Sequence, residues 1–169
     1  MQRKISSLLL FVLLVTAGCS LSVKNVPQNS NQDPNITAIK QVLHSQLTGP
    51  DSEFINGLDN IPKLEQYYEK RYKSYFTEEM YNSFVSAYAY NYLLMAHVKG
   101  QQLKVDAVNV KRIDSKDDIY DFKALVLYGK KGSNQKSAEV SGSVNFNKEG
   151  KITGITYSED DGLSKELKD

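Results

Sequence analysis

The chain has 169 residues, of which 40% are hydrophobic, 24% are charged and one is a cysteine. Its formal net charge of +1 argues against a nucleic-acid-binding protein, because such proteins usually carry a strongly basic surface. A single cysteine excludes an intramolecular disulfide, so a core of apolar side chains has to stabilise the fold.

Residues 1–18 have the pattern of a secretory signal peptide. Arg3 and Lys4 precede an unbroken apolar run over residues 8–15, and small residues then lead to Cys19. The run is about half as long as the ~20 residues that a membrane-spanning helix needs. We therefore expect residues 1–18 to direct export and to be removed. The loss of Arg3 and Lys4 would change the net charge of the chain from +1 to −1.

The expected cleavage site resembles a bacterial lipobox. Ala17, Gly18 and Cys19 match that pattern, while Thr16 stands where leucine is usual. The resemblance implies cleavage between Gly18 and Cys19, with a diacylglycerol attached to the Cys19 thiol. Two acyl chains are enough to hold a soluble domain on a bilayer. We expect a lipid-anchored protein on the outer face of a bacterial cell membrane. The alternative is an ordinary signal peptide followed by an accidental cysteine.

The first folded element is expected after a polar segment. Residues 19–35 are poor in aromatic side chains and contain two prolines, which predicts a flexible tether behind the lipidated cysteine. Asp33 suits the N-cap of a helix and Pro34 suits its first position. Apolar residues at helical spacing then predict a helix over residues 34–47, which Gly49 and Pro50 end.

Two more helices are expected after a polar loop over residues 51–60. The first begins at Asn60 and continues to about residue 76, with tyrosines along its inner face. Thr77 is a good N-cap for the next, which should run from about residue 78 to Val98 and end at Gly100. This last helix is rich in apolar residues, so we expect it to be buried over much of its surface.

Alternating patterns replace the helical period after Gly100. Apolar and polar residues alternate over residues 103–110, and the alternation shifts by one residue near Ala107, which predicts a β-bulge. Residues 119–128 have apolar side chains on both faces, which indicates a central strand covered on both sides. Residues 138–146 and 151–157 predict a hairpin, and Gly142 offers a place to bend.

Helices followed by antiparallel strands predict an α+β domain over residues 36–157, with three helices packed on one face of a curled four-stranded sheet. We expect residues 158–169 to form a polar, frayed tail. The order resembles the NTF2-like (cystatin-like) superfamily, and specifically its lipoproteins of Gram-positive bacteria. The resemblance lies in residues 64–84, where residues 72–79 join two helices, and in the hairpin over residues 144–152.

This resemblance implies a cone-shaped sheet that can enclose a pocket. Members of the superfamily include isomerases, dehydratases and non-catalytic partners in secretion or conjugation machinery, so the fold does not decide the chemistry. A cystatin-type sheet wrapped on the long third helix is the nearest alternative architecture.

The sequence contains no catalytic motif that we could identify. His44 and His97 lack metal-ligand spacing, so we predict neither a metal site nor a cofactor. An isomerase-type site would need a carboxylate in an apolar pocket beside a tyrosine, for which Asp106 and Asp121 are the candidates. Neither matches a motif, and we predict no catalytic residue.

The 11 tyrosines are the remaining unusual feature, and eight of them crowd residues 67–92. Most fall on the expected inner faces of the helices. Tyr90 lies off that stripe, and we predict that it contacts a ligand or partner, with Tyr88 and Tyr92 as neighbouring candidates.

Two functions follow from these observations. The first is a membrane-tethered, non-catalytic binding or accessory module with an envelope protein as partner, for example in secretion, conjugation or transport. The second is a small-molecule pocket protein, with or without isomerase-type chemistry inside the cone. The oligomeric state stays open.

Overall fold

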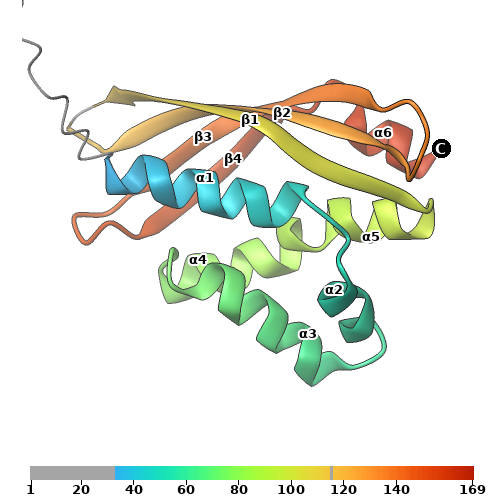
Figure 1. The fold of residues 1–169 in the computed structure, drawn as a ribbon. Helices are drawn as coiled ribbons and strands as arrows, with labels where there is room; N and C mark the ends of the chain where they lie inside the picture. The colour runs from blue at the N-terminus through green and yellow to red at the C-terminus, as the bar shows by residue number, and fades with distance from the viewer. Residues whose placement is uncertain (1–32, 115) are drawn as a thin grey trace, which may run out of the picture. The chain divides into compact units, whose positions relative to one another are not determined.

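A computed structural model describes residues 33–114 and 116–169, in which helices precede the strands (Figure 1). The elements are α1 (Pro34–Leu47), α2 (Ser52–Gly57), α3 (Ile61–Tyr68), the π-helical turn η1 (Glu69–Lys73), α4 (Glu78–Phe84), the π-helical turn η2 (Val85–Ala89), α5 (Asn91–Val98), β1 (Gln101–Asp114), β2 (Ile119–Lys130), β3 (Lys136–Phe146), β4 (Ile152–Glu159) and α6 (Leu163–Lys168). The predicted α+β class, with helices and four antiparallel strands, is confirmed.

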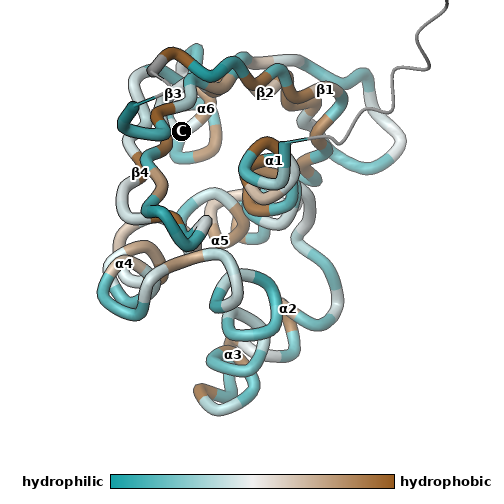
Figure 2. The backbone as a smooth tube through the Cα atoms, turned by 90° about the vertical axis from the view of Figure 1, so that its left-hand side faces the viewer, coloured by the Kyte–Doolittle hydropathy of each residue, from teal (hydrophilic) through white to brown (hydrophobic). Residues whose placement is uncertain are grey.

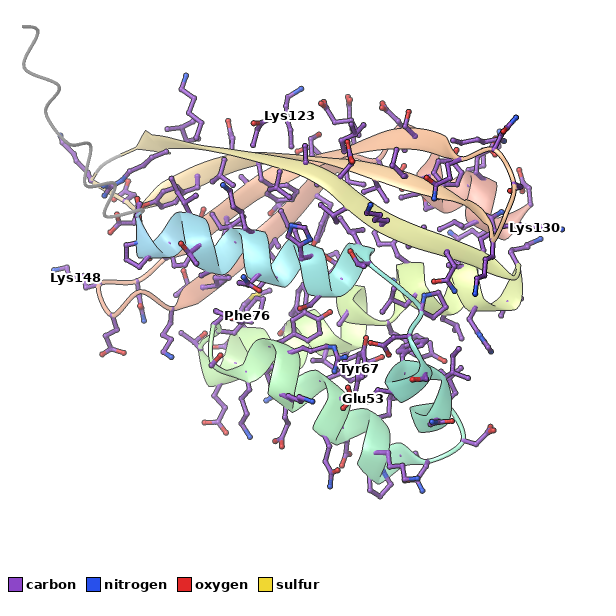
Figure 3. The ribbon with its side chains drawn as sticks, in the orientation of Figure 1. Glu53, Tyr67, Phe76, Lys123, Lys130 and Lys148 are labelled. Atoms are coloured by element: carbon purple, nitrogen blue, oxygen red, sulfur yellow. The ribbon has the colours of Figure 1, made fainter. Side chains whose placement is uncertain are left out.

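The strands form an antiparallel sheet in the order β1-β2-β3-β4. Along β2, Tyr120, Phe122 and Val126 point to the buried face, as their alternation predicts. The expectation that β2 is covered on both sides is wrong. Lys123 is exposed on the outer face, Leu125 keeps 37% of its surface accessible, and none of the described helices covers that face (Figures 1 and 3).

Two local irregularities shape the sheet. The register between β1 and β2 shifts between Val105 and Ala107, so the predicted bulge is confirmed and Asp106 is its extra residue. Gly142 allows a close approach. A Cβ atom there would lie 2.0 Å from the Thr156 carbonyl oxygen and 2.8 Å from Cζ of Phe122. Any side chain at this position would therefore push β4 and the Phe122 ring away.

Helix α1 fills the concave side of the sheet. Figure 2 shows the strands curving around the helix when it is viewed end-on. The backbone N–H of Asn35 donates to the Asp33 side chain at 2.9 Å, which is the predicted N-cap. One face of the helix then buries its apolar side chains completely or almost completely, at Ile39, Val42, Leu43 and Leu47. Each such side chain stabilises the fold by about 1.5–3 kcal/mol.

Gln46 is the one fully buried polar side chain among the described residues. Its Nε2 donates a hydrogen bond to the backbone oxygen of Tyr88 at 3.2 Å, and the Tyr157 hydroxyl donates to its Oε1. A single side chain on α1 thus links η2 to β4. Because a buried amide without partners is costly, this pair of bonds fixes the position of the helix in the sheet.

The helices after α1 differ from the prediction in number. Residues 34–98 contain five α-helices and two π-helical turns instead of three helices. Helix α2 occupies the expected loop, η1 extends α3, and η2 interrupts the long third helix. The turn before α4, which contains Phe76 (Figure 3), is fixed to the sheet by two backbone hydrogen bonds. The N–H of Ile152 donates to the Tyr75 carbonyl oxygen at 2.8 Å, and the N–H of Thr77 donates to the Ile152 carbonyl oxygen at 3.1 Å.

Arg71 joins α2 to the α3–η1 helix. Its guanidinium carbon lies 3.6 Å from the centre of the Tyr67 ring, and its nitrogens lie 2.8 Å from Asp51 and 3.0 Å from Glu53 (Figure 3). The Arg71 side chain is only 19% exposed, so these contacts are partly shielded from solvent.

The expectation of a frayed tail over residues 158–169 is wrong. Residues 163–168 form α6, and both Leu163 and Leu167 are buried. Their spacing of four residues places them on one face of the helix, which packs on α5. Burial of this small apolar face stabilises the packing of α6 on α5.

Two tyrosine-to-phenylalanine substitutions should have opposite effects on stability. The Tyr72 hydroxyl is buried without a hydrogen-bond partner in the described part of the chain, whereas the Tyr157 hydroxyl donates to Gln46. We expect Tyr72→Phe to be neutral or stabilising by up to ~1 kcal/mol, and Tyr157→Phe to be destabilising by about 1–3 kcal/mol. Urea unfolding at neutral pH measures both. Equal losses in the two variants would contradict the described hydrogen bonding.

Candidate binding site

The three tyrosines singled out by the sequence do not lie together. Tyr90 is half-buried and packs on Phe54, with ring centres 6.4 Å apart. Its predicted place as the leading contact residue remains a prediction, but the ring is partly covered by the protein itself. Tyr88 and Tyr92 line one surface hollow, which the sequence did not identify.

We call this feature the tyrosine hollow. It has a volume of about 250 Å³ and lies between α5, β4 and α6. Its lining residues are Tyr88, Asn91, Tyr92, Met95, Tyr157, Asp160, Ser164 and Lys168. The rings of Tyr88 and Tyr157 have their centres 5.1 Å apart, so aromatic surface makes up part of the wall.

A polar group fixes one side of the tyrosine hollow. The Tyr92 hydroxyl donates to Oδ2 of Asp160 at 3.1 Å, and the backbone N–H groups of Gly162 and Ser164 each donate to the same carboxylate at 3.0 Å. Burial and the neighbouring Asp160 carboxylate raise the pKa of Tyr92 well above its ordinary value. Tyr92 therefore remains a hydrogen-bond donor at neutral pH.

Asp160 has the opposite shift. Its partial burial acts to raise the pKa, but hydrogen bonds from Ser164, Tyr92 and Gly162 outweigh that effect and lower the pKa of Asp160 below its ordinary value. The carboxylate is consequently held ionised and in a fixed orientation. Gly162 makes the turn into α6 with a φ of 76°, in the left-handed region that favours glycine.

The floor of the tyrosine hollow is rigid. Burial raises the pKa of Tyr157 well above its ordinary value, and its hydroxyl is held by Gln46 on α1. The hollow can thus offer aromatic faces, the flexible side chain of Met95, a fixed carboxylate and the exposed ammonium of Lys168. These groups suit one apolar or aromatic group with a polar end.

A second hollow lies on the outer face of the sheet. It measures about 440 Å³, and polar side chains such as Asn109, Lys111, Asp121 and Ser141 line it. Lys123 at its edge already pairs with Glu139 at 2.6 Å. No tyrosine lines this second hollow, so it does not contain the side chains that the sequence predicted for binding.

The remaining chemical candidates are dispersed. Asp106 and Asp121 are exposed, so neither carboxylate sits in the apolar interior that isomerase-type chemistry would need. His44 is exposed on α1, and His97 is half-buried near the end of α5. Across residues 33–114 and 116–169, no cluster of three histidine, cysteine, aspartate or glutamate side chains could hold a metal ion.

The predicted lipidation site, Cys19, and the preceding Gly18 lie outside the described residues. Of the helices that the structure describes, none combines the length and the apolar character required to cross a membrane.

Comparison of the chain with models of protein families, with curated protein sequences and with solved structures gives no match.

The lowered pKa of Asp160 predicts how stability depends on pH. The ionised carboxylate contributes stability above its unfolded pKa, which is about 3.9, and loses it as the pH falls through the lower folded value. Asp160→Asn should unfold at neutral pH with a free energy lower by about 1 kcal/mol. The difference from the natural protein should shrink as the pH falls below about 4.

Urea titrations across this pH range measure the effect. Asp59→Asn is the matched control, because Asp59 is exposed and makes no hydrogen bond or ion pair within the described residues. A difference at Asp160 that is independent of pH would contradict a structural role for its charge.

Proposed function

We propose that the protein is a lipid-anchored, extracytoplasmic and non-catalytic binding module of a Gram-positive cell envelope. In this proposal Cys19 carries the anchor, and the tyrosine hollow receives an apolar or aromatic side chain of an envelope protein. The observation that carries the binding role is the convergence of Tyr88, Tyr92 and Met95 on one hollow with a polar rim.

The anchor proposal is supported by the order of features near the start of the chain. A short apolar run precedes the lone Cys19, and the described domain begins at Asp33. The 13 residues that separate these two positions would span roughly 20 Å as a flexible chain. Such a tether would let the domain turn and meet partners close to the membrane surface.

The binding proposal is supported by the chemistry of the tyrosine hollow. Tyrosine and methionine are enriched at protein interfaces, and a pocket that accepts one large side chain can supply much of the binding energy. The Asp160 carboxylate and the exposed Lys168 at the rim could fix the orientation of the partner through hydrogen bonds. We therefore favour a protein segment that inserts one aromatic residue.

A small-molecule-binding role is the second candidate. The fixed Tyr92–Asp160 pair at 3.1 Å favours it, because a donor and a carboxylate held together can orient a small polar ligand. Isomerase-type chemistry inside the sheet has less support, since Gln46, Phe122 and other buried side chains occupy that space.

We also propose that the domain is a variant of the NTF2-like fold. Support comes from the helices that precede a four-stranded antiparallel sheet and from the curvature of that sheet around α1 (Figure 2). The additional helix α2 and the π-helical turns would be features of this chain.

Substitution of Cys19 tests the anchor. In a Gram-positive host, we expect the natural protein to incorporate labelled fatty acid and to sediment with membranes, and Cys19→Ser to do neither because it lacks the thiol nucleophile. Ser20→Ala is the matched control and should behave like the natural protein. An unacylated natural protein in the soluble fraction would rule out the anchor.

An uncharged aromatic probe tests the tyrosine hollow. N-acetyl-tryptophanamide should bind with a Kd of roughly millimolar, because one side chain offers little contact area. NMR should show the largest shifts at Tyr88, Tyr92 and Met95. Tyr92→Ser should abolish them, whereas Leu125→Ser on the outer sheet face should not. Shifts elsewhere, or shifts that survive Tyr92→Ser, would refute the assignment of the hollow.

A further inference from the structure

A second recess lies on the other helices, between α3–η1 and α4–η2, and we call it the helical groove. It has a volume of about 560 Å³. Its lining includes Glu65, Tyr68, Glu69, Tyr81 and Val85. None of them belongs to the tyrosine hollow.

The backbone around the helical groove departs from regular α-helix on both sides. Glu69 begins the π-helical turn η1, and Val85 begins η2. A π-helical turn inserts an extra residue and costs stability, and such turns are frequent at functional sites. Here residues of both π-helical turns line one groove.

Aromatic surface forms the floor of the helical groove. Tyr68 is 4% exposed, and its hydroxyl has no hydrogen-bond partner among the described residues. An unsatisfied buried hydroxyl is unfavourable, so the free protein holds the Tyr68 side chain at the base of the groove at some cost in stability. Tyr81 and Val85 are half-buried beside it and extend the apolar surface.

One wall of the helical groove is acidic and the opposite wall is neutral. Glu65 and Glu69 are exposed one helical turn apart on α3–η1, whereas Asn82 and Ser86 occupy the α4–η2 side. Glu65 has no ion-pair partner within the described residues. Glu69 pairs only with Lys73, at 2.6 Å and on the solvent-exposed surface, so this pair is weak and can exchange.

The negative charges of the acidic wall act on Tyr81 in the floor of the groove. Burial raises the pKa of Tyr81, and the carboxylates of Glu69 and Glu65 raise it further against the opposing charge of Lys73. A positive charge placed in the groove would therefore be attracted from one side and could lie over tyrosine rings.

We propose that the helical groove binds a segment of a partner protein in which one arginine or lysine lies between apolar residues. The aliphatic stem of that side chain packs on Tyr68 and Tyr81, and its charged end pairs with Glu65. Ile61, which is 72% exposed next to the groove residue Pro62, supplies a contact for a flanking apolar residue. The site is separate from the tyrosine hollow and does not depend on it.

Two peptides that differ only in charge test this proposal. Acetyl-Leu-Arg-Leu-amide should bind to the full-length protein and shift the ring resonances of Tyr68 and Tyr81. The peptide with citrulline in place of arginine has nearly the same shape without the charge. We expect it to bind about fivefold more weakly, and we expect 0.5 M salt to reduce this difference.

Glu65→Gln should lower the affinity for the arginine peptide about fivefold and leave the citrulline peptide unchanged. Glu149→Gln, on the β3–β4 turn, is the matched control and should change neither affinity. Val85→Lys places a competing cation in the groove and should weaken the arginine peptide selectively, so the proposal does not rest on one variant.

Equal affinities for the two peptides would overturn the proposal, as would an affinity for the arginine peptide that is unchanged by Glu65→Gln. Shifts at Tyr88 and Tyr92 alone would also overturn it while leaving the tyrosine hollow intact as a binding site. Conversely, loss of N-acetyl-tryptophanamide binding would not affect the helical groove.

Discussion

The packing of α1 into the concave face of the sheet is the constraint on which the rest of the structure depends. A curved four-stranded sheet has an apolar inner face that must be covered, and the buried side of α1 covers it. Gln46 fixes the orientation of α1 within this packing, because its side chain accepts a hydrogen bond from Tyr157 on β4 and donates one to the backbone oxygen of Tyr88 on η2. The helix thus fixes the sheet and the following helices in one arrangement.

Filling the interior moves the candidate sites to the surface. Phe122 and the close approach at Gly142 occupy the space in which a wider cone could hold a ligand. The tyrosine hollow and the helical groove both lie at the surface, and the π-helical turn η2 contributes residues to each of them. Tyr88 of η2 contributes to the hollow, whereas Val85 contributes to the groove. Two small surface recesses fit the proposed binding to a protein better than chemistry on an enclosed substrate.

The sequence predicted those features that local chemistry determines. Asp33 and Pro34 identified the start of α1, and the change of phase near Ala107 identified the β-bulge. It did not predict the features that depend on tertiary contacts. The apolar residues on the outer face of β2 form the same sequence pattern whether a helix covers that face or solvent does. The π-helical turns have no pattern of their own, and the tyrosine hollow needs three segments distant in sequence. Leu163 and Leu167 were the one available indication of α6.

The central claim is that α1 leaves no ligand space inside the sheet, so that recognition takes place at the surface. Benzene is a probe small enough to enter any apolar cavity, and a titration of the full-length protein followed by NMR of methyl and aromatic groups locates where it binds. The account predicts shifts at Tyr88, Tyr92 and Met95 and none at the buried Val126 and Val140. Shifts at Val126 and Val140 would show an open interior and contradict the account.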